Sequence, residues 1–273
     1  MRGPKTLLDC EDNWETRLGA WFPGERVVLR GKDLFQELGD SSWMGLLLYA
    51  ITGREFNDQQ IRLFDGMWLL CSSYPDPRLW NNRVAALAGT VRSTSVLGVS
   101  AAIAVSEASI YGRRPDVRCI DFLYRTRQRL ESGETLESIV RSELKKHKAI
   151  FGYGRPIVRT DERIAPLMSL VEQLGFADGY FIKLVFEIEK VLLAGRWRMQ
   201  MNIAAVAAGL AADQELSTHE YYRFSILCFS AGATACNIDA SSKPQGSFFP
   251  LRCQRIRYQG NPARSWDKPY TGT

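Results

Sequence analysis

The sequence predicts a mainly α-helical protein with one large domain or two modest ones. Its 273 residues are 45% hydrophobic and 24% charged, which is typical of a globular chain and excludes a disordered or collagen-like one. Apolar residues recur three and four positions apart, the period of an amphipathic helix, in several segments. These segments are KDLFQEL, WMGLLLYAIT, QQIRLFDGMWLLCSS, IAPLMSLVEQLGF and GYFIKLVFEIEKVLLA.

Local start and stop signals set the expected helix boundaries. Residues 40–42 (Asp-Ser-Ser) precede WMGLLL and residues 57–58 (Asn-Asp) precede QQIRLF, where their side chains can cap the first turn. Gly175 closes SLVEQLG as a C-terminal glycine. Strand-like alternation is confined to two short pieces, ERVVLRG near the start and RIRYQG near the end.

Small residues recur through the apolar helical pattern of residues 82–110. Small side chains let helix backbones approach closely, so this stretch predicts a buried helix pair or a helix interface. The segments MNIAAVAAGLAAD and FSAGATACN have the same character, and residues 241–247 (SSKPQGS) are typical of a loop.

The charge pattern favours a small anionic ligand over nucleic acid. The net charge is +5, and 26 arginines stand against 9 lysines, a bias toward the planar group that suits carboxylates and phosphates. The arginines are scattered, and no nucleic-acid motif accompanies them. No apolar run reaches the roughly 18 to 20 residues of a membrane span, and acids directly follow the basic start, so we predict a cytoplasmic protein.

Cysteine and histidine usage narrows the chemistry. The six cysteines lie far apart with no CxxC pair, which predicts buried reduced thiols instead of a metal site or disulfides. There are only two histidines: His147 lies in the charged run SELKKHKAI, and His219 lies beside Glu220. Both are predicted to be solvated surface residues, so histidine acid–base chemistry is disfavoured.

Two loops carry the candidate chemistry. Residues 109–115 (SIYGRRP) end the small-residue stretch, and residues 151–156 (FGYGRP) place an aromatic between two glycines. Such glycines let backbone N–H and C=O groups reach a ligand directly. Arg155, Arg159 and Arg163 follow at four-residue spacing and can contact an anion.

The second loop, GYGRPIVRTDERI, resembles the glycine-rich segment of the citrate synthase superfamily, which includes citryl-CoA lyase-like members. PDPRLWNNRVAALAGT, MNIAAVAAGLAADQELS and RIRYQGNPAR resemble other family segments in the same order. The resemblance implies an all-α, citrate synthase-like fold. It implies a large helical domain (residues 1–112 and 207–273) and a smaller inserted helical domain (residues 113–206) that closes over the ligand.

The sequence departs from the family at its catalytic positions. The histidine that hydrogen-bonds the thioester carbonyl falls on Tyr111, and the histidine of the glycine-rich loop falls on Arg155. The aspartate that removes the acetyl proton falls on Asn202, or on Gln200 if the alignment shifts, and a third histidine falls near Pro75. An amide cannot accept a proton at neutral pH, so Asn202 cannot replace this aspartate as the base. The loss of a general base lowers the rate about 10²- to 10⁴-fold.

The family's anion-binding positions stay basic. The resemblance places Arg163 and Arg255, or Arg252 in place of Arg255, at the substrate carboxylates. It places Gly152, Tyr153, Gly154 and Arg159 beside coenzyme A. We expect Arg155 and Arg163 to converge on one pocket, where their charges would repel each other in the empty site. We also expect Arg163 to pair with ligand and not with the protein core.

The resemblance therefore implies an acyltransferase or lyase of altered chemistry that uses a coenzyme A thioester and an anionic carboxylate, without a metal. Tyr111 would donate to a carbonyl, Arg155 would stabilise an enolate or oxyanion, and Asn202 would position a reactant. Such a paralogue would suit specialised biosynthesis. The alternative is a catalytically inactive paralogue that binds ligand or a partner, and an orthodox citrate synthase is disfavoured because the family's histidines are missing.

The resemblance also implies a partner. Family members are homodimers that pack small-residue helices across a two-fold axis, which we take to explain Ala86, Gly89, Ala101 and Ala102 better than packing within one chain. A homodimer is therefore expected. The alternative is a heterodimer with another citrate synthase homologue.

Overall fold

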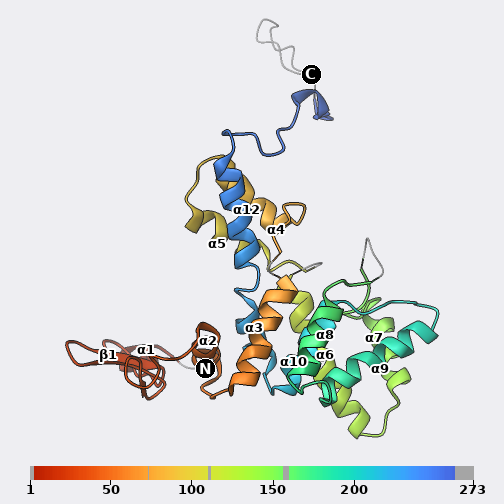
Figure 1. Cartoon of the computed structure of the whole chain (residues 1–273), viewed down its shortest axis with the longest axis horizontal. Coiled ribbons are helices and arrows are strands. Elements are labelled where there is room, and N and C mark those ends of the chain that lie inside the picture. The colour runs from red at the N-terminus through yellow and green to blue at the C-terminus, as the bar shows by residue number, and fades with distance from the viewer. Residues whose placement is uncertain (1–2, 73, 110–111, 156–159, 262–273) are drawn as a thin grey trace, which may run out of the picture.

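The computed structural model describes residues 3–72, 74–109, 112–155 and 160–261, and they form a mainly helical protein (Figure 1). The predicted fold class is therefore confirmed. The helices and strands are α1 (Pro4–Asp9), β1 (Gly19–Phe22), β2 (Arg26–Leu29), β3 (Lys32–Asp33), α2 (Trp43–Thr52), α3 (Asp58–Ser72), α4 (Trp80–Thr90), α5 (Ser95–Val105), α6 (Arg113–Glu131), α7 (Leu136–His147), α8 (Ile164–Gln173), α9 (Tyr180–Ala194), α10 (Ile203–Asp213), α11 (Thr218–Ser225), α12 (Ser230–Ser242) and the 3₁₀ helix η1 (Cys253–Arg255).

The predicted helix signals act as expected. The Ser42 hydroxyl caps α2 by accepting from the Gly45 N–H at 3.0 Å. Asn57 and Gln60 cap α3 reciprocally: the Asn57 Oδ1 accepts from the Gln60 N–H, and the Gln60 Oε1 accepts from the Asn57 N–H. Gly175, at φ +78°, follows the end of α8.

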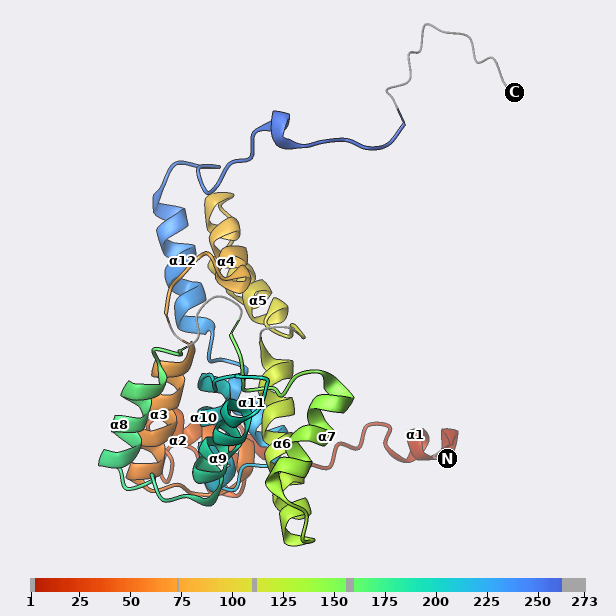
Figure 2. The ribbon, with the colours of Figure 1, turned by 90° about the vertical axis from the view of Figure 1, so that its right-hand side faces the viewer.

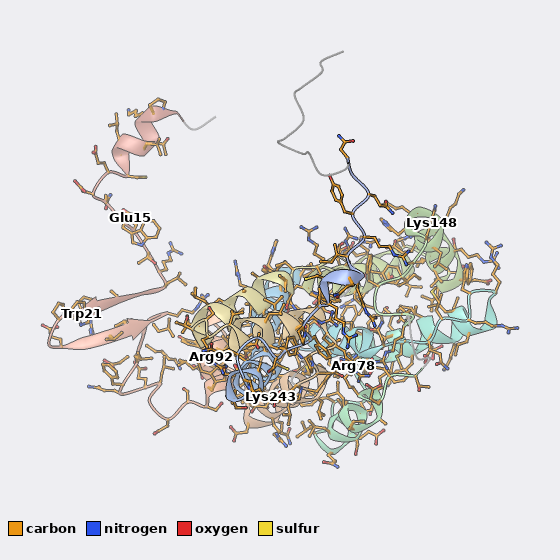
Figure 3. The ribbon with its side chains drawn as sticks, turned by 90° about the horizontal axis from the view of Figure 1, so that it is seen from above. Glu15, Trp21, Arg78, Arg92, Lys148 and Lys243 are labelled. Carbon is orange, nitrogen blue, oxygen red and sulfur yellow. The ribbon has the colours of Figure 1, made fainter. Side chains whose placement is uncertain are left out.

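The β structure is one small antiparallel sheet in the order β1-β2-β3. Its middle strand confirms the prediction for ERVVLRG. The strand prediction for RIRYQG is wrong, because that segment contains the end of η1 and then exposed chain that pairs with no strand among the described residues. Both ends of the described chain extend away from the helices (Figure 2), and Figure 3 shows Trp21 at the tip of the projecting hairpin.

The main core surrounds α10. Nine of its eleven residues are buried, most of them alanine, and the helix packs against α6 and α9. At Gly209 a Cβ would lie 3.2 Å from the Phe181 carbonyl oxygen, so glycine permits the close approach of α9. Buried side chains of α2, α3, α6, α7, α8, α9 and α11 join the same core. The division at residues 113 and 206 stays a prediction.

A second group of helices, α4, α5 and α12, projects together from the main body (Figures 1 and 2). A Cβ on Gly89 would lie 2.4 Å from the Asn237 carbonyl oxygen of α12, so these helices cross at very short range. Ala85 of α4 and Ala102 of α5 are buried with Ala233 of α12. The predicted helix pair is therefore confirmed as α4 and α5.

Packing within one chain accounts for Ala86, Gly89 and Ala102, which corrects the interpretation that a second subunit explains them better. Ala86 is buried against Cys236 and Ala240, and Ala102 has no exposed surface. Ala101 is exposed. The long apolar side chains of the same helices point outward instead: Leu87, Val91, Val96, Leu97, Val105 and Ile238 are 38–75% exposed.

The cysteines are reduced, but not all are buried. Four are buried and two are exposed, so the prediction holds for Cys71, Cys119, Cys228 and Cys236 and is wrong for Cys10 and Cys253. Among the described residues, no helix is both long and apolar enough to cross a membrane.

Candidate functional site

A cavity of about 780 Å³ lies where the end of α3, the first turns of α6 and α10, and the end of α11 meet. Four arginines and three carboxylates contribute to its wall. The wall includes Cys71, Asp76, Arg78, Arg113, Asp116, Gly152, Gly154, Arg155, Glu162, Arg163, Asn202, Ile203, Ala204, Tyr221, Cys228 and Phe229. A volume of this size suits a cofactor or a sizeable small molecule.

The glycine-rich loop reaches the cavity through its backbone. Gly152 and Gly154 have φ values of +90° and +88° and line the wall. A Cβ on Gly152 would lie 2.7 Å from the Cys119 sulfur, so a larger residue does not fit. Tyr153 points the other way, because its hydroxyl donates to the Val185 carbonyl at 2.9 Å inside the core. All three residues were predicted to lie beside coenzyme A; Gly152 and Gly154 line the wall, whereas Tyr153 is buried in the core.

Asn202 connects this loop to α10. Its Oδ1 accepts from the Ala204 N–H at 3.0 Å and caps the helix, while its Nδ2 donates to the Gly154 carbonyl at 3.0 Å. Its backbone N–H donates to the Gly152 carbonyl at 2.8 Å. The first turn of α10 therefore opens into the cavity, with Asn202 on the wall. The alternative position, Gln200, is not part of the described wall.

Asp161 is a buried anchor that the sequence analysis did not predict. Its side chain has no exposed surface, and its carboxylate accepts two hydrogen bonds from Arg163, at 2.8 and 2.7 Å, and one from the Ile203 N–H at 2.9 Å. Burial by itself raises the pKa of this carboxyl, but the hydrogen bonds from Arg163 and Ile203 outweigh it and hold the pKa below its usual value.

Arg155 and Arg163 both line the cavity, as predicted. The expectation of two unpaired guanidinium groups is wrong, because each is paired with a carboxylate, and this pairing outweighs the repulsion that Arg163 exerts on Arg155. Arg155 Nη1 lies 2.7 Å from Glu162 Oε2 and also donates to the Thr160 carbonyl. Arg163 pairs with Asp161, so the expectation that it pairs only with ligand is also wrong.

The floor of the cavity holds a buried ion pair. Arg113 and Asp116, both in the first turn of α6, lie 3.2 Å apart, and the Arg113 guanidinium also covers the Phe229 ring at 4.3 Å. Arg113 is one of the two arginines in the loop at residues 109–115 that was identified from the sequence. Arg114 is exposed.

Other predicted site residues lie elsewhere. Arg255 and Arg252 are exposed in the C-terminal tail, outside the described cavity wall, and Pro75 is exposed. Tyr111 and Arg159 fall outside the described residues. None of these placements tests the role assigned to each residue.

Both histidines lie away from this cavity. His219 is exposed on α11, and the His147 side chain is 38% exposed at the end of α7, which confirms them as surface residues. Among the described residues, no group of three or more His, Cys, Asp or Glu side chains is placed to hold a metal ion.

Comparison by sequence finds no match: no protein-family model and no curated protein matches this chain. Comparison by structure finds strong matches. Citryl-CoA lyase from Hydrogenobacter thermophilus superposes with a TM-score of 0.79 at 19% identity, over 92% of this chain and 96% of that one. ATP citrate lyase from Methanosaeta concilii, in complex with (3S)-citryl-CoA, gives a TM-score of 0.72 at 15% identity, over 96% of this chain and 45% of that one.

A third solved structure extends the likeness to a citrate synthase. The enzyme from Thermoplasma acidophilum, in a ternary complex with carboxymethyl coenzyme A and oxaloacetate, gives a TM-score of 0.59 at 15% identity. The match covers 84% of this chain and 60% of that one. The three structures share one architecture with the chain described above.

Proposed function

On the premise that the chain has the citrate synthase-like fold, we propose that it is a divergent enzyme acting on an acyl-CoA or related thioester and an anionic carboxylate co-substrate. It makes or breaks a carbon–carbon or acyl bond, as an acyltransferase or lyase. One observation carries the proposal: four arginines and the first turn of α10 meet in a single cavity of about 780 Å³. Guanidinium groups and helix N-termini are both suited to carboxylates and phosphates.

The proposed site residues divide between the two substrates. In this proposal Gly152, Gly154 and Arg159 contact coenzyme A, with Tyr153 anchoring the loop. Arg163 and Arg255 bind the carboxylate of the co-substrate. Arg155 stabilises an oxyanion, Tyr111 donates to a carbonyl, and Asn202 positions a reactant. The Asn202 amide bonds both α10 and the glycine-rich loop, which supports a positioning role.

A homodimer completes this site. The outward apolar side chains of α4, α5 and α12 form a surface that a second copy of this chain can cover. Arg255 lies on a tail that extends away from its own helices (Figure 2), so in a dimer it can reach the partner's cavity. A heterodimer with another citrate synthase homologue would use the same surface.

The second candidate is a catalytically inactive paralogue that only binds ligand or a partner. One observation favours it: the described cavity wall offers no usual base at these positions. It contains no histidine, and Asn202, which caps the N-terminus of α10, cannot act as a base. Turnover separates the two candidates, because both predict binding.

The test starts with mass spectrometry of ligands that the native protein retains, followed by thermal shifts with coenzyme A thioesters and di- or tricarboxylates. A ligand at a hundredfold excess over its dissociation constant should stabilise the fold by about 2.7 kcal/mol. Arg155→Lys keeps the charge but loses the two-pronged geometry, so it should weaken the shift. Arg141→Lys, on the exposed face of α7, is the matched control and should leave it unchanged.

Activity is then followed as consumption of each acyl-CoA in the presence of each carboxylate. We expect turnover with some pair and none above background with acetyl-CoA and oxaloacetate. Binding without turnover of any pair supports the inactive paralogue. No thermal shift with any thioester or carboxylate contradicts the enzyme and the ligand-binding paralogue, and leaves only a paralogue that binds a partner.

A further inference from the structure

Three carboxylates line the described cavity, and two of them are poor bases. Asp76 bonds its neighbour Arg78, with the closest contact at 2.6 Å, and this hydrogen bond holds the Asp76 pKa below its usual value. Glu162 bonds Arg155 at 2.7 Å, which likewise lowers the pKa of Glu162. A carboxylate with a lowered pKa is a weaker base, so it removes a proton from carbon more slowly.

Asp116 has a different environment. It lies in the first turn of α6, deep in the protein, yet 17% of its side-chain surface stays accessible because it borders the cavity. Its ion pair with Arg113 is longer, at 3.2 Å. Burial raises the pKa of Asp116, and the attraction of Arg113 and Arg163 offsets this only in part.

The remaining groups around Asp116 are neutral at physiological pH. Burial raises the pKa of Tyr221 on α11 and of Cys71 on α3, and it raises the pKa of Cys228 to about 11. The α10 residues on the same wall are apolar. The groups that interact electrostatically with Asp116 are Arg113, Arg163, Cys71, Cys119, Tyr221 and Cys228.

We infer that Asp116 is the base that removes the α-proton of the acyl thioester, a role for which Asn202 has no chemistry. This inference rests on the proposed function. A carboxylate oxygen of Asp116 takes the proton from the carbon next to the thioester carbonyl. The C–H electron pair forms the enolate double bond, and the carbonyl π pair moves onto oxygen as negative charge. In the direction of bond cleavage, the protonated Asp116 returns its proton to the enolate carbon.

The surrounding cations fit this step. Arg113 and Arg163 are the positively charged groups that interact electrostatically with Asp116, and all three line the cavity. An enolate oxygen that forms beside Asp116 is therefore stabilised by both guanidinium groups. As the carboxylate becomes neutral by accepting the proton, the enolate takes over its negative charge. The net charge facing the two guanidinium groups therefore stays constant through the step.

Proton exchange tests the inference without knowledge of the co-substrate. The full-length protein is incubated in D₂O with acetyl-CoA or propionyl-CoA, and deuterium at the α-carbon is measured by mass spectrometry. We expect exchange in the wild-type protein and a loss of about 10²- to 10⁴-fold in Asp116→Asn. Asp121→Asn, on the exposed side of the same helix, is the control and should exchange at the wild-type rate.

Two further measurements separate catalysis from structure. Thermal shifts with the same thioesters should be equal in wild-type protein and in Asp116→Asn, and Asp116→Glu should recover part of the exchange. The wild-type exchange rate should fall on acidification as Asp116 becomes protonated. This profile keeps the inference testable even where Asp116→Asn does not fold.

The outcomes distinguish this inference from the proposed function. Thioester binding with wild-type exchange in Asp116→Asn overturns the inference and leaves the proposed function standing. Binding without any exchange in the wild-type protein does the same. If no thioester binds the wild-type protein, both are wrong.

Discussion

Arg163 connects Asp161 to the end of α3 through hydrogen bonds. It donates two hydrogen bonds to the Asp161 carboxylate, at 2.8 and 2.7 Å, and a third to the Cys71 carbonyl at 2.6 Å. Asp161 in turn accepts from the first N–H of α10. One guanidinium on the cavity wall therefore links three segments that are far apart in the sequence, and its removal affects the fold as well as the ligand.

Arg163→Ala should destabilise the protein even without ligand. It leaves the Asp161 carboxylate, which has no exposed surface, without its main partner, and breaking a buried ion pair costs about 3 to 5 kcal/mol. Urea unfolding of the ligand-free proteins measures the change. Arg141→Ala breaks an exposed pair with Glu137 and serves as the control with little effect. Equal stability of Arg163→Ala and wild type would show that the buried pair contributes nothing.

Asp161→Asn should lose stability in a pH-dependent way. The Asp161 pKa is lower in the folded state than the value of about 3.9 in the unfolded chain. Its contribution to stability is therefore complete above that value and is lost as the pH falls through the folded-state pKa. The gap in unfolding free energy between wild type and Asp161→Asn should shrink on acidification below about pH 4. A gap that stays constant from neutral pH to pH 2 contradicts this.

Asp116→Asn should show the opposite dependence. The Asp116 pKa is raised in the folded state, so between the unfolded-state and folded-state pKa values the folded protein binds more protons. Wild-type stability then falls as the pH rises through this window, whereas asparagine does not titrate. Asp116→Asn should become more stable relative to wild type as the pH rises above about 4, the unfolded-state pKa, toward the raised folded-state pKa. Chemical denaturation at several pH values measures this, and a reversed trend would assign Asp116 a lowered pKa.

Gly89→Leu should destabilise a single chain. A Cβ there would already lie 2.4 Å from the Asn237 carbonyl oxygen, and a leucine side chain forces α4 and α12 apart. Such overpacking costs roughly 1 to 3 kcal/mol or more. Thermal unfolding at concentrations low enough to populate monomers separates this effect from association. An unchanged midpoint under those conditions would contradict the packing within one chain.

Leu97→Glu should break the proposed homodimer without unfolding the chain. Leu97 is 65% exposed on α5, and a charge there opposes burial against a second copy. Leu193→Glu, at a 43% exposed site on α9, is the matched control and should remain dimeric. Light scattering at micromolar concentration measures both. A monomeric wild-type protein would remove the homodimer from the proposal.

The features that sequence predicted best are local. The period of the apolar residues and the caps at Ser42 and Asn57 depend on neighbours within a few positions, so they carry over into helices. The exception is KDLFQEL, where the helical period is wrong because the segment forms β3 and turns. The glycine-rich loop was visible for the same reason. RIRYQG failed because a strand needs a partner, and alternation in one segment says nothing about whether a second strand lies beside it.

The missed parts of the site depend on distant segments. Asp161 was not singled out from the sequence, because only the fold brings Ile203 and Cys71 to its ion pair with Arg163. Asp116 was not singled out from the sequence, because its raised pKa arises from burial in the folded chain, which the attraction of Arg113 and Arg163 offsets only in part. Gly89 was assigned to a second subunit because sequence does not show that α12 returns to cover α4.

The cap at position 202 has an evolutionary consequence. Aspartate and asparagine are about equally good N-caps, because each offers an oxygen to the second or third N–H of a helix. The family resemblance puts a catalytic aspartate at this position, and here the Asn202 Oδ1 still caps α10. A lineage can therefore exchange a proton acceptor for an amide by one conservative substitution, with no penalty in folding to oppose it. In such an exchange the side-chain oxygen that caps the helix is kept while the proton acceptor is removed.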